Sequence, residues 1–187
     1  MTMCDLSFFD FAAYLDSVAS LYPGGVPERY IKDSSKDAPS CGAVSCCGNR
    51  EAPLLFVGLR SGSQGGFEGR EGELLAAAIT KGMKLSLGDV QVLSVFSCLG
   101  GIDEQEEARA ALKENLALSK PKLIVLLGLE TLRLCGFSPE GKRGEWLTWQ
   151  EIPVMPTHAL KPVLSDLSVK KEFWQDLKQV LERLSEI

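Results

Sequence analysis

The sequence lacks any apolar run that approaches the roughly 20 residues needed to cross a membrane. Its wholly apolar stretches are short, and residues 123–127, for example, have the length of a β-strand. The N-terminus also lacks the basic segment of a secretory signal and carries Asp5, Asp10 and Asp16 instead. These absences predict a cytoplasmic protein without a membrane partner.

Positive charge is also scarce, because 20 Lys and Arg stand against 25 Asp and Glu and the formal net charge is −5. Proteins that coat nucleic acid take much of their affinity from neutralising phosphates, so this balance disfavours that class. An enzyme that touches a few phosphates through a local basic patch is compatible with it. Histidine is the rarest residue, and the single one is His158.

The six cysteines lack the spacing of a zinc site. Cys41 and Cys46 are separated by four residues, Cys47 follows directly, and no second close pair comes later. In a reducing compartment we expect buried or loop thiols rather than disulfides. A metal or redox role stays open as the alternative for four of them, Cys41, Cys46, Cys47 and Cys98.

The length of 187 residues fits a single domain over 1–187, with no internal repeat and no linker. Residues 1–50 are predicted to hold an amphipathic helix at 6–21 and then an irregular segment rich in Pro, Gly, Ser and charge. Residues 51–187 are predicted to form the core. A long irregular stretch of this kind is usually functional or mobile.

Strand and helix patterns alternate along the predicted core. Apolar runs predict buried strands that begin at Leu54, Val90 and Leu123, with one or two more strands at 146–149 and 152–155. Helical periodicity predicts helices at 72–82, 104–118 and 168–185, with a short helix before Cys135. This order predicts a three-layer α/β/α fold around a central, mostly parallel sheet of four to five strands.

Ligands of such folds bind beyond the carboxyl ends of the strands. The segment that begins at Gly58 follows the first strand and is rich in glycine, so its backbone amides could cradle an anion. It matches neither a Walker A loop nor the dinucleotide fingerprint. Arg60 and Arg70 flank it and are candidates for phosphate contacts. The alternative is a mobile surface loop with solvated charges.

Two further residues near the strand ends have chemistry suited to a planar ligand. Phe67 could serve as a stacking platform, and His158 could donate a hydrogen bond to a developing oxyanion. A loop phenylalanine can equally tuck under its own loop, and a lone histidine can be an incidental surface residue. Each of these signals is weak by itself.

Five segments, taken together and in this order, resemble motifs of the uracil-DNA glycosylase superfamily. The nearest branch is its iron–sulfur-type bacterial and archaeal branch, and the resemblance continues into the terminal helix. The five segments are APLLFVG (52–58), FEGREGELL (67–75), VLSVFSC (92–98), KPKLIVLLG (120–128) and IPVMPTH (152–158), followed by KKEFWQDL (170–177). The resemblance implies hydrolysis of the N-glycosidic bond of a base such as uracil, flipped out of DNA that is single-stranded or damaged. It also implies the family's α/β fold.

The resemblance assigns roles residue by residue. Phe67 matches the aromatic residue that stacks on the base, and His158 matches the late histidine that stabilises the departing base anion. The other substrate-binding candidates, Gly58, Leu59, Arg60 and Ser94, lie at the first glycine motif and at the end of the next strand. Leu59 replaces an acidic residue that positions water, and Ser94 replaces an asparagine that reads the base. These departures predict altered, slow or lost excision.

The cluster ligands of that branch are mostly missing. Only Cys98 occupies a ligand position, Ala108 stands at another, and the early Cys-x-x-Cys has no counterpart. We therefore expect no iron–sulfur cluster, no other cofactor and no metal ligands. Two alternatives to a divergent glycosylase stay open: an inactive member that binds nucleic acid, a small molecule or a protein, and a redox or metal-responsive protein.

Overall fold

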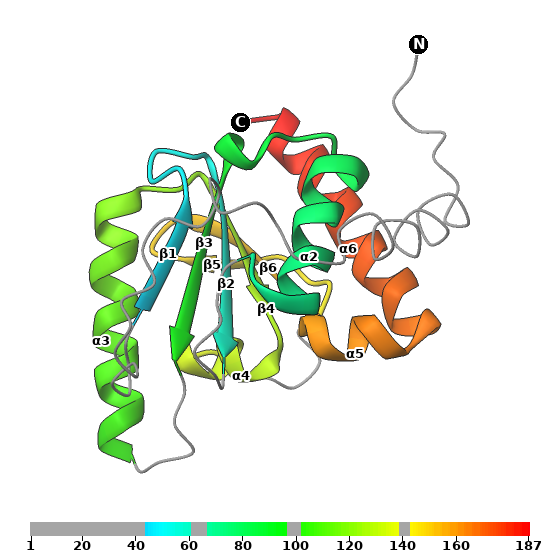
Figure 1. Ribbon diagram of the computed structural model, residues 1–187. Helices are drawn as coiled ribbons and strands as arrows, with labels where there is room; N and C mark the ends of the chain where they lie inside the picture. Colours follow the sequence, from blue (N-terminus) through cyan, green and yellow to red (C-terminus); the bar gives the residue numbers. More distant parts are fainter. Residues whose placement is uncertain (1–43, 61–66, 97–101, 139–142) are drawn as a thin grey trace.

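The computed structural model describes residues 44–60, 67–96, 102–138 and 143–187 (Figure 1). The predicted helix at 6–21 lies outside these ranges, as do Cys4, Cys41 and Cys98. Among the described residues, no helix is both long enough and apolar enough to cross a membrane.

Six strands form one sheet in the order β1-β3-β2-β4-β6-β5. The four central strands are parallel: β3 (Val90–Phe96), β2 (Leu54–Arg60), β4 (Leu123–Leu127) and β6 (Ile152–Thr157). The runs that begin at Leu54, Val90 and Leu123 are therefore neighbouring strands of one sheet, which confirms the prediction. They are almost wholly apolar because helices cover both faces of the sheet.

Both edges of the sheet are antiparallel strands, β1 (Val44–Gly48) and β5 (Leu147–Trp149). β1 was not predicted, because its sequence VSCCG lies within the segment expected to be irregular. Its residues are half-buried or exposed, so an apolar pattern is not required of them. What makes this segment a strand is its pairing with β3, more than 40 residues away in the chain.

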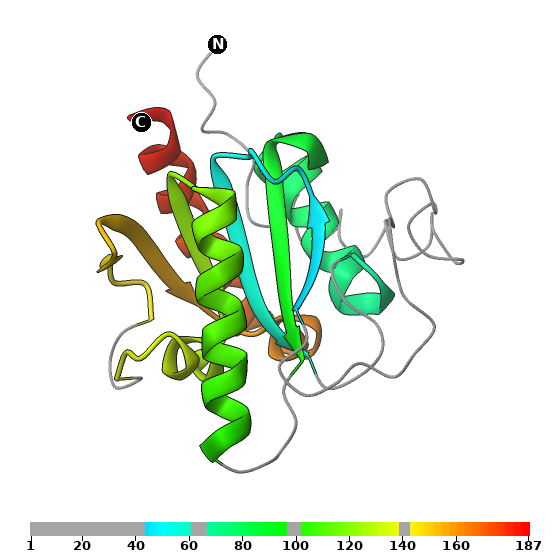
Figure 2. The ribbon, with the colours of Figure 1, turned by 90° about the vertical axis from the view of Figure 1, so that its left-hand side faces the viewer.

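Helices cover the two faces of the sheet, which gives the predicted three layers (Figure 2). One face packs against α3 (Ile102–Ser119) and α4 (Leu129–Leu134). The other packs against α2 (Gly69–Ala77), α5 (Leu160–Ser165) and α6 (Leu167–Ser185). α2 continues as a π-helical turn, Ala78–Gly82, and a short 3₁₀ turn, Leu87–Asp89, precedes β3.

α6 begins and packs as its sequence dictates. The Asp166 carboxylate caps the helix by accepting hydrogen bonds from the amides of Ser168 at 2.8 Å and Val169 at 3.3 Å. Its apolar stripe is buried against the sheet and consists of Phe173, Trp174, Leu177 and Val180. One acidic residue, Asp176, lies buried beside that stripe, and its partners are described below.

Candidate functional site

The carboxyl ends of the four parallel strands place one residue each in a single row across the sheet. In strand order these are Ser94, Gly58, Leu127 and Thr157, and each is in register with the next. With neighbouring strands about 4.8 Å apart, the row spans about 14 Å. Two of the predicted site residues, Gly58 and Ser94, are thus direct neighbours in the sheet.

The row faces the layer formed by α2, α5 and α6. Leu127 packs in the hydrophobic cluster on that face, together with Phe67 and the buried side of α6. Ser94 is two residues beyond Val92, which belongs to the same cluster, so both point to the same face. Gly58 leaves room beside Leu127, since an added Cβ would meet that side chain at an ordinary 3.5 Å. The side chains around this row define the candidate site.

His158 directly follows the last residue of the row. Its Nε2 lies 2.8 Å from Oε2 of Glu172, which comes from α6. Nη2 of Arg143 lies 3.5 Å from the same carboxylate oxygen. The histidine side chain is 23% exposed, so the ring is partly accessible to solvent. His158 is therefore held in place by a carboxylate that the resemblance did not point to.

The backbone beside His158 is fixed by the turn after β4. The amide of Gly128 donates a 3.0 Å hydrogen bond to the carbonyl oxygen of Thr157. Gly128 has a φ of +95°, a conformation that residues with a Cβ rarely adopt, and an added Cβ would lie 2.9 Å from that of Ala159. This close packing ties the start of α5 to the end of β4.

A second carboxylate of α6 holds the end of β6. The Thr157 hydroxyl donates a 2.6 Å hydrogen bond to Oδ2 of Asp176, and Nη1 of Arg143 lies 3.1 Å from the same oxygen. Asp176 is buried, and burial raises the pKa of its carboxyl, although the bonds from Thr157 and Arg143 oppose this rise. Arg143 thus bridges Asp176 and Glu172.

Sequence reasoning missed Arg143, Glu172 and Asp176. One signal was present, since Glu172 and Asp176 are four residues apart and so lie on one face of the helix. An aspartate among the apolar positions of an amphipathic helix indicates a buried partner. The sequence does not reveal that this partner comes from the end of β6 and from the segment before β5.

Phe67 lies in the core rather than on the surface. Its side chain is only 2% exposed and belongs to the hydrophobic cluster under α2, α5 and α6. Gly72 in the first turn of α2 makes this possible, because an added Cβ would lie 2.1 Å from the Phe67 carbonyl carbon. A base can stack on the ring only if the atoms that cover it move apart.

The structure does not bring Leu59 together with Gly58 and Ser94. Leu59 still belongs to β2, and its side chain packs against the cluster under α3 and α4, on the opposite face of the sheet. Neither its chemistry nor its direction therefore suits the predicted role in substrate binding. Arg60 is the last residue of β2, and its side chain lies outside the described part of the chain.

The described thiols do not converge on one point. Cys46 and Cys47 are consecutive residues of β1, and they pack against opposite faces of the sheet. The Cys46 thiol donates a 3.4 Å hydrogen bond to Oδ1 of Asn115, and burial raises the pKa of Cys135 to about 12. Cysteine binds metals as the thiolate. In the described ranges, no group of three or more His, Cys, Asp or Glu could hold a metal ion, so these residues do not fit an iron–sulfur cluster.

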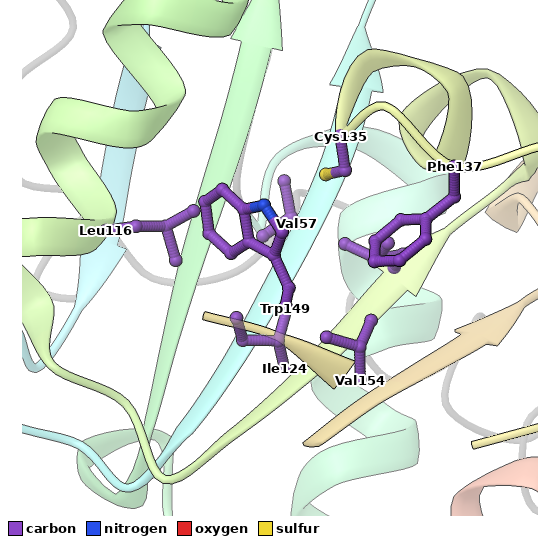
Figure 3. Close-up of a pocket in the computed structure, with 8 residues that line it drawn as sticks. Val57, Leu116, Ile124, Cys135, Phe137, Trp149 and Val154 are labelled. Carbon is purple, nitrogen blue, oxygen red and sulfur yellow. The ribbon is translucent and has the colours of Figure 1, made fainter. Parts of the chain in front are cut away.

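One apolar crevice lies on the other face of the sheet, between β5 and the helices α3 and α4. The Trp149 ring occupies its centre, between Leu116 on one side and Cys135 and Phe137 on the other (Figure 3). The space among these side chains is about 190 Å³ including the solvent at its mouth, and no part of it encloses a water molecule. The crevice therefore offers no enclosed ligand cavity, and it lies on the face opposite the candidate site.

Comparison with known families gives one match. The sequence model of the Uracil DNA glycosylase superfamily matches residues 47–178. This range includes the whole row at the carboxyl ends of the strands, as well as His158, Glu172 and Asp176. A comparison with curated proteins found no match.

Proposed function

We propose that this chain, which belongs to the uracil DNA glycosylase superfamily, hydrolyses the N-glycosidic bond of a damaged base such as uracil after the base has left the DNA helix. One observation carries the proposal: the sole histidine of the chain directly follows the row formed by Ser94, Gly58, Leu127 and Thr157. A flipped base needs backbone and polar groups for its edge beside a group that can exchange protons.

Each residue of the site has a proposed role that follows from its chemistry. Ser94 offers a hydroxyl for the edge of the base, and Gly58 lets the base approach the backbone closely. Phe67 supplies an aromatic face once the atoms that cover it move apart, and His158 handles the proton that the departing base requires. DNA is the partner, and Arg60, Arg70 and Lys161 are the candidates for phosphate contacts near the strand ends.

The Leu59 side chain is apolar and cannot hold a water molecule for the attack, so we expect excision to be slow. The test is an excision assay with oligonucleotides that carry uracil, hypoxanthine or xanthine, each single-stranded and double-stranded. The protein is prepared from a host that lacks its own uracil glycosylase, and abasic sites are cleaved with alkali and counted. We expect abasic sites to accumulate with at least one base, at a rate that falls as salt rises.

Two other outcomes are informative. Salt-sensitive binding to these oligonucleotides without any excision would overturn the hydrolytic proposal and favour an inactive member that binds nucleic acid. The position of Leu59 on the opposite face of the sheet is the observation that favours this second candidate. Absence of both binding and excision would overturn DNA as the partner.

We also propose that the protein works without an iron–sulfur cluster. At most one of Cys46 and Cys47 can reach any single cluster, because their side chains lie on opposite faces of β1. Anaerobically purified protein is expected to contain far less than one iron per chain and no labile sulfide. Stoichiometric iron with labile sulfide would contradict this, and it would require ligands from the cysteines outside the described ranges.

A further inference from the structure

We propose that Glu172 is a positioning residue that makes His158 a proton acceptor for the attacking water. The inference rests on the proposed function and adds a residue and a proton route to it. It starts from the hydrogen bond of 2.8 Å between Nε2 of His158 and Oε2 of Glu172. A carboxylate can only accept hydrogen bonds, so Nε2 carries the hydrogen.

The other ring nitrogen, Nδ1, is then the one that can act in the reaction. It has no hydrogen-bond partner among the residues that the structure describes. In the neutral ring, with hydrogen on Nε2, Nδ1 holds a lone pair and accepts a proton. The carboxylate therefore selects an accepting Nδ1, as the aspartate of a Ser-His-Asp triad selects the tautomer of its histidine.

Arg143 keeps the carboxylate in this position. Its guanidinium reaches both Glu172, at 3.5 Å, and Asp176, at 3.1 Å, so the two α6 carboxylates are joined through one side chain. Asp176 is bonded in turn to Thr157, the residue before His158. The Asp166 carboxylate at the start of α6 also interacts electrostatically with the ring. Contacts with α6 thus hold the His158 ring directly, through Glu172, and the backbone beside it, through Thr157.

In the proposed step, one proton passes from water through His158 to the departing base. Nδ1 takes a proton from water while the water oxygen bonds to the anomeric carbon of the sugar. The bond from that carbon to the base nitrogen breaks, and its electron pair leaves with the base. The imidazolium then returns the proton from Nδ1 to the base anion. This route replaces the carboxylate that Leu59 does not provide, since Leu59 is apolar and faces the other side of the sheet.

The test compares wild type with Glu172→Gln, His158→Ala and the control Glu182→Gln. Glu182 is exposed on the same helix, about 15 Å further along it at about 1.5 Å per residue. The buried carboxylate of a Ser-His-Asp triad is worth about 10⁴ in kcat. We expect roughly a 10- to 100-fold loss of kcat in Glu172→Gln with KM little changed, because Glu172 is 44% exposed and water can partly replace it.

A second readout does not depend on catalysis. The chain has one histidine, so protein labelled at the histidine nitrogens gives a single imidazole spectrum by NMR. We expect a downfield, slowly exchanging Nε2 proton in wild type and in Glu182→Gln, and its loss in Glu172→Gln. A wild-type spectrum without this proton would overturn the positioning role, whatever the activity.

Failure of the positioning proposal can be distinguished from failure of the proposed function. If wild type excises a base and His158→Ala does not, but Glu172→Gln keeps the wild-type kcat, the positioning proposal is wrong and the proposed function stands. If wild type excises no base, the proposed function fails and the proton route fails with it, and the NMR spectrum then decides only whether Glu172 holds the ring.

Discussion

Replacing His158 with alanine is expected to slow base excision by roughly 10²- to 10³-fold, the usual effect of removing one group that stabilises a departing anion. His158 is the only imidazole in the chain. The measurement is the single-turnover rate of excision on the best oligonucleotide of the base panel.

Folding is the necessary control for this variant. The bond between His158 and Glu172 is partly exposed to solvent, so its loss should change the free energy of unfolding by less than about 1 kcal/mol. A matched urea titration of wild type and His158→Ala checks this point. Excision at the wild-type rate by a folded His158→Ala variant would show that the catalytic group lies elsewhere.

Replacing Asp176 with alanine is expected to lower the free energy of unfolding by about 2–3 kcal/mol, the usual worth of hydrogen bonds to a charged group. The Asp176 side chain is 3% exposed, and it accepts from the Thr157 hydroxyl and from Arg143. Alanine would leave the buried Thr157 hydroxyl without its acceptor. The loss of this partner costs less free energy at Arg143, because its side chain is 35% exposed to water and remains near Glu172.

Two variants serve as controls in the same urea titrations. Asp176→Asn keeps an oxygen that can accept from Thr157, so it should be less destabilising than Asp176→Ala. Glu182→Ala removes a carboxylate from the exposed side of α6 and should change stability by less than about 0.5 kcal/mol. Equal stability of Asp176→Ala and Glu182→Ala would contradict the assignment of this network.

Protonation of Asp176 should add a pH-dependent part to the free energy of unfolding, separate from the hydrogen bonds to Thr157 and Arg143. Burial raises the pKa of its carboxyl in the folded state above the ordinary value of 3.8. Folding therefore favours the protonated form, and this pH-dependent part is present below pH 3.8 and lost as pH rises through the raised folded pKa. The stability of wild type relative to Asp176→Asn should accordingly fall as pH rises through that window.

Much of the central sheet followed from the sequence alone. The runs that begin at Leu54 and Leu123 are apolar without interruption, and the run from Val90 is interrupted only by Gln91 and Ser94. Segments of this kind are expected to be buried on both sides. Alternation with helices then makes these strands parallel neighbours, and parallel neighbours bring their carboxyl ends to one edge. The sequence therefore predicts that Gly58 and Ser94 lie at the same edge, and they are direct neighbours in the sheet.

The edges of the sheet and the groups that support His158 were decided only by the tertiary structure. β1 has no local pattern of a strand and exists through its pairing with β3. Glu172 looks like any solvated charge on α6, and its bond to His158 depends on how that helix crosses the end of β6. Periodicity reports which face of a segment is buried, because burial repeats along the chain. It carries no information on which two polar groups meet, because such pairs are set by the packing of segments that are distant in sequence.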